Sequence, residues 1–194
     1  MSSGEPGGDG STTADPEADP STDPSIDPDR RRRCLLILGG MAVGAVVLDQ
    51  LVKWWVVSAI KPRLESGEGP ILVVGDLLKF TYVENTGAAF SIGVGYTWIF
   101  TIVAVVVAVV ILRTSRRLGS VGWALALGGL LGGLLGNLID RLTRPPGPGL
   151  GYVVDFISLP YFAVFNIADM FITLSAAGMV LLALRGVEIS GPRG

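Results

Sequence analysis

Two acidic side chains, Asp155 and Asp169, lie in the otherwise apolar stretch Val153–Phe171. Asp169 also shares a helical face with Asn166, three residues earlier. A carboxylate in hydrocarbon costs about 2.5–3.5 kcal/mol even on the gentler insertion scale. Two of them in one short stretch indicate either a polar site at a membrane face, where each acid biases the pKa of the other, or a pair of helix caps and interhelical hydrogen bonds. This stretch alone leaves both interpretations open.

The composition restricts the chemistry that these acids can perform. The chain has no histidine, which excludes Ser-His-Asp and Cys-His arrangements and HExxH zinc sites but not Ser-Lys chemistry. Its one cysteine, Cys34, cannot form an intramolecular disulfide, and we interpret it as a structural thiol. The best-supplied mechanism uses two acids: an ionised one activates water and a protonated one polarises a peptide carbonyl. Which acid is the base stays open, and we expect no metal and no cofactor.

The chain is 49% hydrophobic over 194 residues, which is typical of a protein that crosses a membrane several times. The apolar runs predict four membrane-spanning helices, at about 34–58, 96–112, 121–139 and 162–184. Arginines cluster before the first run, between the second and third, and after the fourth. The positive-inside rule then predicts that both termini are cytoplasmic.

The segments outside these runs complete the predicted organisation. Residues 1–33 form a disordered, acidic, Pro-rich tail with a basic flank, and residues 186–194 form a short cytoplasmic tail. Residues 34–185 then form one membrane domain. Short β-like runs at Ile71–Val74 and Leu78–Val83 predict a small sheet between the first two spans, with Asp155 on a further strand or turn. The fold class is thus an α-helical membrane protein, four transmembrane helices with a small extracytoplasmic β-cradle.

Several polar residues can support the two acids. Asp49 and Lys53 are four residues apart in the first span and are expected to form an ion pair, with Lys53 extending outward to water. Asp140 and Arg141 end the third span; we favour an ion pair between them, and the alternative is that a buried Arg141 fixes a backbone carbonyl. Asn85 suits a binding loop or a turn.

Glycines recur every four residues in the third span, at 128, 132 and 136 and again at 129 and 133. This pattern predicts that neighbouring helices approach closely.

The topology derived from arginines alone puts the polar residues on one side, toward the outer leaflet, which favours a functional site. Two rival interpretations are a small ion-coupled transporter and a non-catalytic scaffold. A transporter needs polar residues on both sides of the membrane, whereas those of this chain lie mostly on one side. The chain also has no internal repeat, which argues further against a transporter. A scaffold is expected to tolerate Asp155→Asn and Asp169→Asn.

Five short motifs carry a resemblance to a known family. They are DQLVK at 49–53, NTGAAFS at 85–91, GNLIDR at 136–141, VVDF at 153–156 and FNIAD at 165–169. In this order and spacing, from about Leu48 to Leu184, the chain resembles the lipoprotein signal peptidase (signal peptidase II) family, membrane aspartic proteases of bacteria. Each motif is weak alone, but the ordered set is specific. The acidic tail has no counterpart in the family pattern.

The resemblance implies an intramembrane aspartyl endopeptidase that removes signal peptides from prolipoproteins. It implies cleavage just before a diacylglyceryl-modified cysteine, and globomycin-type inhibition. It matches Asp155 and Asp169 to the catalytic pair. It also matches eight residues to positions that bind substrate or support the site: Asp49, Lys53, Asn85, Gly87, Asn137, Asp140, Arg141 and Asn166. The implied partners are prolipoprotein substrates and membrane lipids, not nucleic acid, and the enzyme is expected to be a monomer in the bacterial plasma membrane.

Overall fold

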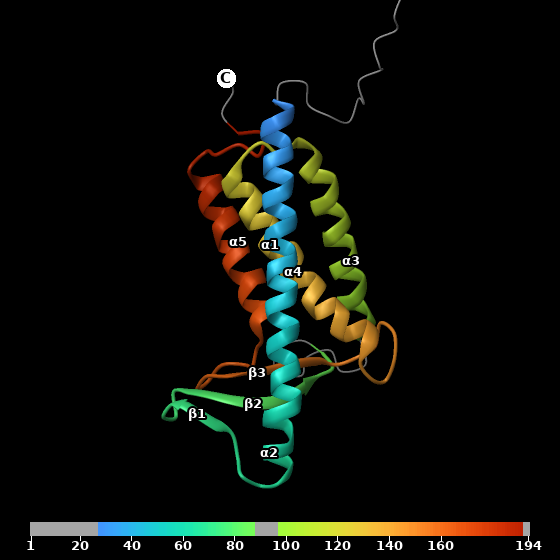
Figure 1. Cartoon of the computed structure of the whole chain (residues 1–194), viewed down its shortest axis with the longest axis vertical. Helices are drawn as coiled ribbons and strands as arrows, with labels where there is room; N and C mark the ends of the chain where they lie inside the picture. The colour runs from blue at the N-terminus through green and yellow to red at the C-terminus, as the bar shows by residue number, and fades with distance from the viewer. Residues whose placement is uncertain (1–26, 88–96, 192–194) are drawn as a thin grey trace, which may run out of the picture.

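A computed structural model describes residues 27–87 and 97–191 of the chain. The acidic tail up to residue 26 lies outside the described residues, as do residues 88–91 of the NTGAAFS motif. The described part is a bundle of helices standing on a small sheet (Figure 1).

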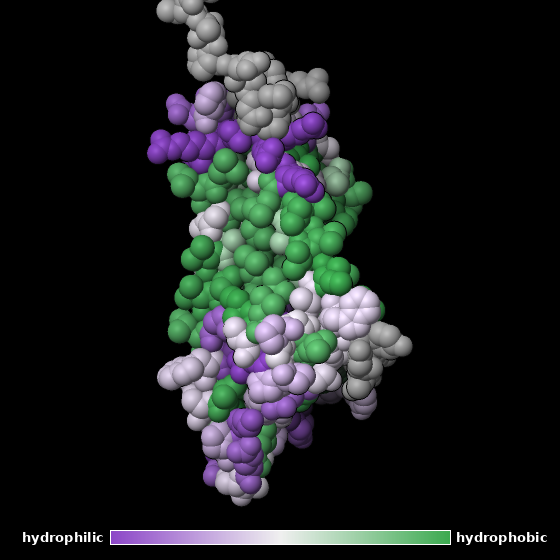
Figure 2. All heavy atoms as spheres, turned by 90° about the vertical axis from the view of Figure 1, so that its right-hand side faces the viewer, coloured by the Kyte–Doolittle hydropathy of each residue, from purple (hydrophilic) through white to green (hydrophobic). Residues whose placement is uncertain are grey.

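The described residues contain four helices long and apolar enough to cross a membrane, as the sequence predicts. The first is α1 (Pro28–Trp55), which continues through the π-helical turn η1 (Val56–Ile60) into α2 (Lys61–Glu65). The others are α3 (Thr97–Thr114), which ends in the 3-10 turn η3 (Ser115–Arg117), α4 (Val121–Thr143) and α5 (Ile167–Leu184). Their apolar side chains form a continuous hydrophobic band between two polar ends (Figure 2).

Several predicted helix boundaries are wrong, and the starts of the first and last helices have a clear physical cause. The first helix begins at Pro28, well before residue 34, because the Asp27 side chain caps it by accepting a hydrogen bond from the Asp29 amide (3.0 Å). The last helix begins at Ile167, not near Phe162. Phe165 instead forms an antiparallel bridge with Ile157, and this bridge extends the sheet edge up to the capping residue of α5.

Helix α4 lies at the centre of the bundle, and its glycines explain why. A Cβ on Gly128 or Gly132 would lie 2.6 Å from a backbone carbonyl oxygen of α1. A Cβ on Gly133 would lie 2.5 Å from the carbonyl oxygen of Ala168 in α5. The predicted close approach is therefore confirmed, and it involves two neighbours: one glycine row meets α1 and the other meets α5.

The sheet is antiparallel in the order β1 (Ile71–Val74), β2 (Leu78–Asn85), β3 (Val153–Ser158). Its register pairs Val83 with Asp155 and Asn85 with Val153. Alternate residues of β3 therefore point to opposite faces. Phe156 and Val154 pack into an apolar cluster with Val56 and Ile60 of η1. This packing holds β3 against the first helix and turns Asp155 toward the bundle.

Candidate active site

Asp155 lies on the face of β3 that looks into the bundle, and it is 2% exposed. The Asn85 amide nitrogen donates to its Oδ2 (2.8 Å), and the Asn166 amide nitrogen donates to its Oδ1 (2.6 Å). Burial raises the pKa of Asp155 to about 7, and the negative charge of Asp169 adds to the effect. The two amides lower that pKa, but burial prevails.

Asp169 lies in the first turn of α5, where Asn166 is the N-cap. The Asn166 side chain accepts from the Asp169 amide (3.0 Å), and the Asp169 carboxylate accepts from the Asn166 amide (3.2 Å). This capping box explains the three-residue spacing. Asn166 itself lies outside the helix, so the prediction that the two residues share a helical face is wrong. A third bond runs from the Asn137 amide nitrogen to Asp169 Oδ1 (2.8 Å).

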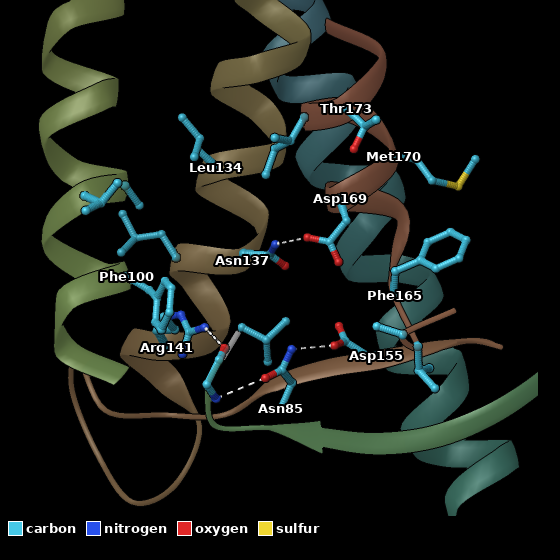
Figure 3. Close-up of a pocket in the computed structure, with 18 of the residues that line it drawn as sticks. Asn85, Phe100, Leu134, Asn137, Arg141, Asp155, Phe165, Asp169, Met170 and Thr173 are labelled. Carbon is cyan, nitrogen blue, oxygen red and sulfur yellow. Dashed lines mark hydrogen bonds between the residues drawn. The ribbon is translucent and has the colours of Figure 1, made fainter. Parts of the chain in front are cut away.

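The structure brings Asp155 and Asp169 to one cavity of about 710 Å³ (Figure 3). Asn166 contacts both acids, because it donates to Asp155 through its side chain and pairs with Asp169 through the capping box. The rest of the lining is mostly apolar and comes from α3, α4, α5 and the segment before α5. It includes Phe100, Leu134, Leu138, Phe162 and Met170. Two carboxyl groups thus meet inside a largely hydrophobic cavity.

Arg141 fixes backbone carbonyls at the edge of this cavity. Its guanidinium donates to the carbonyl oxygens of Gly87 (3.3 Å) and Gly151 (3.4 Å) and lies over the Phe100 ring. The predicted ion pair between Asp140 and Arg141 is therefore wrong, and the alternative of a buried arginine on a carbonyl holds. Gly87 in turn donates its amide to Asn85 Oδ1 (3.0 Å).

A buried ionic network lies behind the two acids. Lys53 Nζ contacts Asp49 Oδ2 (2.8 Å), Asp140 Oδ2 (2.9 Å) and Asn137 Oδ1 (2.9 Å). The predicted pair between Asp49 and Lys53 is confirmed. Lys53 is fully buried, so the prediction that it extends outward to water is wrong. Three acceptors surround its three N–H groups, which is what a buried ammonium requires.

The network also ties helices and strands together. Asp49 Oδ1 accepts from the Ala168 amide at the start of α5 (3.0 Å). Asp140 Oδ2 accepts from the Val154 amide on β3 (3.2 Å). The elements that carry Asp169 and Asp155 are thereby anchored to α1 and α4.

Sequence reasoning missed Arg144 and Gly151. Arg144 Nε donates to Asp140 Oδ1 (2.8 Å), and its guanidinium lies over the Tyr152 ring. The i,i+4 spacing from Asp140 was a usable signal. A Cβ on Gly151 would lie 2.6–2.9 Å from three carbonyl oxygens at the end of α4. Nothing local in the sequence marks that contact.

Apolar helices that cross a membrane and hold two carboxyl groups in one cavity point to a class of protein, the membrane aspartic peptidases. Comparisons with known proteins agree. The family model described as "Signal peptidase (SPase) II" matches residues 41–185. The chain therefore belongs to the signal peptidase II family.

Named relatives and solved structures resemble this chain over most of its length. The Lipoprotein signal peptidase of Streptomyces coelicolor is 44% identical over 84% of this chain and 77% of its own length. That of Leifsonia xyli is 46% identical over 82% and 72%, and that of Mycobacterium avium is 42% identical over 82% and 85%. A solved structure described as a bacterial membrane enzyme matches with a TM-score of 0.63 and 28% identity, over 75% of this chain and 85% of the other.

These findings make the chain a multi-pass membrane protein and an aspartic peptidase. Membership of the family supports removal of signal peptides from prolipoproteins as its activity.

Proposed function

We propose that Asp155 and Asp169 hydrolyse the peptide bond just before a diacylglyceryl-modified cysteine of a prolipoprotein. The observation that carries this proposal is the meeting of the two acids in one apolar cavity, with Asn166 bonded to both. The family supplies the reaction, and the arrangement of the acids supplies a mechanism.

The mechanism uses one ionised and one protonated carboxyl group. The ionised acid takes a proton from a water molecule, whose oxygen attacks the peptide carbonyl. The protonated acid donates to the carbonyl oxygen, and the leaving nitrogen gains a proton as the C–N bond breaks. With a pKa of about 7, Asp155 is protonated in a large fraction of molecules at neutral pH. A pair of carboxyl groups in this state needs no further catalyst.

The supporting residues keep the two acids and the cavity wall in place. Asn85, Asn137 and Asn166 donate amide hydrogen bonds to the acids. Arg141 and Gly87 hold the backbone at the end of β2. The three remaining supporting residues, Asp49, Lys53 and Asp140, form the buried ionic network behind the acids.

The cavity suits a substrate that arrives in the membrane. Phe100 and Val103 of α3, Leu134 of α4, and Met170 and Leu174 of α5 form apolar walls beside the acids. Acyl chains or an apolar signal peptide are therefore accommodated without burying polar groups against hydrocarbon. The substrate proposed here brings both.

The orientation follows from charge. Exposed arginines lie at the end of the bundle remote from the sheet, and that polar end is visible in Figure 2. They are Arg32, Arg33, Arg113, Arg116, Arg117 and Arg185. The positive-inside rule makes this end cytoplasmic, so both termini are cytoplasmic and the two acids lie toward the outer leaflet. Residues 34–185 then form the peptidase domain.

The proposal is tested by incubating the purified protein with a prolipoprotein that carries a diacylglyceryl group on its cysteine. Mass spectrometry of the products should identify a new N-terminus at the lipidated cysteine. The matched control is the same precursor without the lipid, which should be cleaved far more slowly. Equal cleavage of both precursors would contradict the lipid requirement, and a different product terminus would contradict the proposed cleavage site.

A further inference from the structure

The surroundings of the two acids are not equivalent. Asp155 lies on a strand and is almost completely buried. Asp169 is partly exposed and lies in the first turn of α5. A helix N-terminus favours a negative charge, whereas a buried strand position does not. The fold therefore favours the ionised form at Asp169 and the protonated form at Asp155.

The asparagine side chains around the acids have fixed orientations. The oxygen and the NH₂ group of an asparagine side chain can exchange places by a flip. Their positions are fixed by a neighbour that can only donate or only accept a hydrogen bond. Asn85 Oδ1 accepts from the Gly87 backbone amide, and Asn166 Oδ1 accepts from the Asp169 backbone amide. Both side chains must then present their NH₂ groups to Asp155.

Asn137 is oriented by a side chain. Its Oδ1 accepts from the Lys53 ammonium (2.9 Å) and from the Asn166 amide (3.1 Å). An ammonium has no acceptor, so Oδ1 must face Lys53 and the NH₂ group must face Asp169. The ammonium also polarises the amide and strengthens the bond that it donates. In Figure 3, the Asn137 nitrogen points across the cavity to Asp169.

We propose that Lys53 is a positioning residue that acts through Asn137 to make Asp169 the ionised base and Asp155 the protonated acid. This inference rests on the proposed function and adds the division of roles within the pair. Lys53 touches neither acid directly. Its effect on Asp169 passes through one amide that has a single possible orientation.

The roles follow with protons balanced. Asp169 takes a proton from water as the new C–O bond forms. Asp155 gives its proton to the substrate carbonyl oxygen. As the C–N bond breaks, the leaving nitrogen takes up the proton that Asp169 received, and one hydroxyl group of the tetrahedral intermediate returns a proton to Asp155 as the product carboxyl group forms. Three charged groups face Asp155: Asp169 from α5, Lys53 from α1 and Arg141 from α4. Of these, the charge of Asp169 raises the pKa of Asp155 and that of Lys53 lowers it.

The first test observes the proton without any substrate. Infrared difference spectra of the purified wild-type protein, recorded across a pH titration, should contain a carboxylic-acid C=O band that disappears near pH 7. Asp155→Asn should remove the band, and Asp169→Asn should keep it while moving its disappearance to lower pH. A band that survives in Asp155→Asn but is lost in Asp169→Asn overturns the assignment, as does a wild-type protein without such a band.

The second test separates positioning from charge neutralisation. The variant Asp49→Asn/Lys53→Met removes one buried positive and one buried negative charge together, and Asp140 keeps its pair with Arg144. If Lys53 positions the base, kcat falls by roughly 10²-fold with KM little changed. The alkaline limb of the pH profile also moves to higher pH, because the charge of Lys53 lowers the pKa of Asp155. A folded double variant with the wild-type kcat and pH profile overturns the proposal.

A double-mutant cycle completes the design. Asn137→Ala alone should cost about as much kcat as the charge-neutral double variant, and combining the changes should cost little more. Full additivity means that Lys53 and Asn137 act independently, which contradicts the proposed route. The infrared titration of the wild-type protein needs no variant to fold and no cleavage. Failure of the division of roles is thus distinguishable from failure of the peptidase activity.

Discussion

The hydrogen bond from Asn85 to Asp155 allows us to predict how far the pKa of Asp155 changes when Asn85 is replaced. Asn85→Ala removes a donor that lies 2.8 Å from Asp155 Oδ2. A hydrogen bond to a charged group contributes about 1.5–3 kcal/mol. Since about 1.36 kcal/mol corresponds to one pKa unit, and the protonated acid keeps part of the bond, the pKa of Asp155 should rise by about one unit above its starting value of about 7.

The sign of the effect on activity follows from the proposed role of Asp155 as the acid. In that mechanism the active form has Asp155 protonated, so activity falls as the pH rises through its pKa, by about tenfold per pH unit at the far end. Asn85→Ala should therefore move the alkaline limb about one pH unit higher. The rate at neutral pH should nevertheless fall about tenfold, because Asn85 also holds the carboxyl group in place.

The assay is kcat/KM for cleavage of a lipidated prolipoprotein in a fixed lipid mixture, measured from about pH 5 to about pH 10. Glu84→Gln is the matched control. Glu84 is the preceding residue on β2 but faces the other side of the sheet, where its carboxylate accepts a hydrogen bond from the Tyr82 hydroxyl (2.7 Å). Its pH profile should match that of the wild type. An alkaline limb that stays in place, or moves lower, in Asn85→Ala would refute the reasoning about Asp155.

Three further predictions concern other parts of the structure. Gly132→Val should lower the free energy of unfolding by about 1–3 kcal/mol, seen as a lower thermal midpoint, because an added Cβ would lie 2.6 Å from the Ala42 carbonyl oxygen. Gly178→Ala should leave the midpoint unchanged, because an added Cβ would meet nothing within 4 Å. Equal losses in both variants would contradict the glycine contact. Arg141→Lys should lower kcat/KM by about 10–100-fold, because one ammonium cannot hold both the Gly87 and Gly151 carbonyls; an unchanged value would argue against that role. EDTA should leave cleavage unchanged, and strong inhibition would indicate a metal site that the described residues do not reveal.

Much of the bundle could be predicted because its signals are local. Four apolar runs gave four helices, and the i,i+4 spacing of Asp49 and Lys53 gave a real ion pair. The strand Ile71–Val74 has the predicted limits. These features depend on residues within a turn or two of each other, so periodicity and charge spacing report them.

The predictions that were wrong concern features set by contacts between residues distant in the sequence. Asp140 has Arg141 beside it in the chain, but its partners are Lys53, brought to it by α1, and Arg144 one turn later. Lys53 stays buried because α4 supplies acceptors that no local pattern reveals. The start of α5 was missed because the apolar run before it continues smoothly, whereas the capping box sets the boundary.

The pairing of Asp155 with Asp169 is an intermediate case. Both were identified from their types in an apolar setting, but their approach depends on the β2–β3 register and on Asn166, which closes the gap between strand and helix. The resemblance of the five ordered motifs to a known family supported the pairing of these two acids more strongly than residue spacing alone.

The most direct test of the whole account is single-turnover cleavage of a lipidated prolipoprotein by Asp155→Asn and by Asp169→Asn. Asp76→Asn is the matched control, since it makes the same substitution at an exposed acid in the hairpin, whose ion pair within the described residues is with Lys79. We expect each active-site variant to stay folded and to lose at least about 10³-fold in rate, while the control keeps the wild-type rate. Turnover within about tenfold of wild type in either Asp155→Asn or Asp169→Asn would contradict a two-carboxyl mechanism.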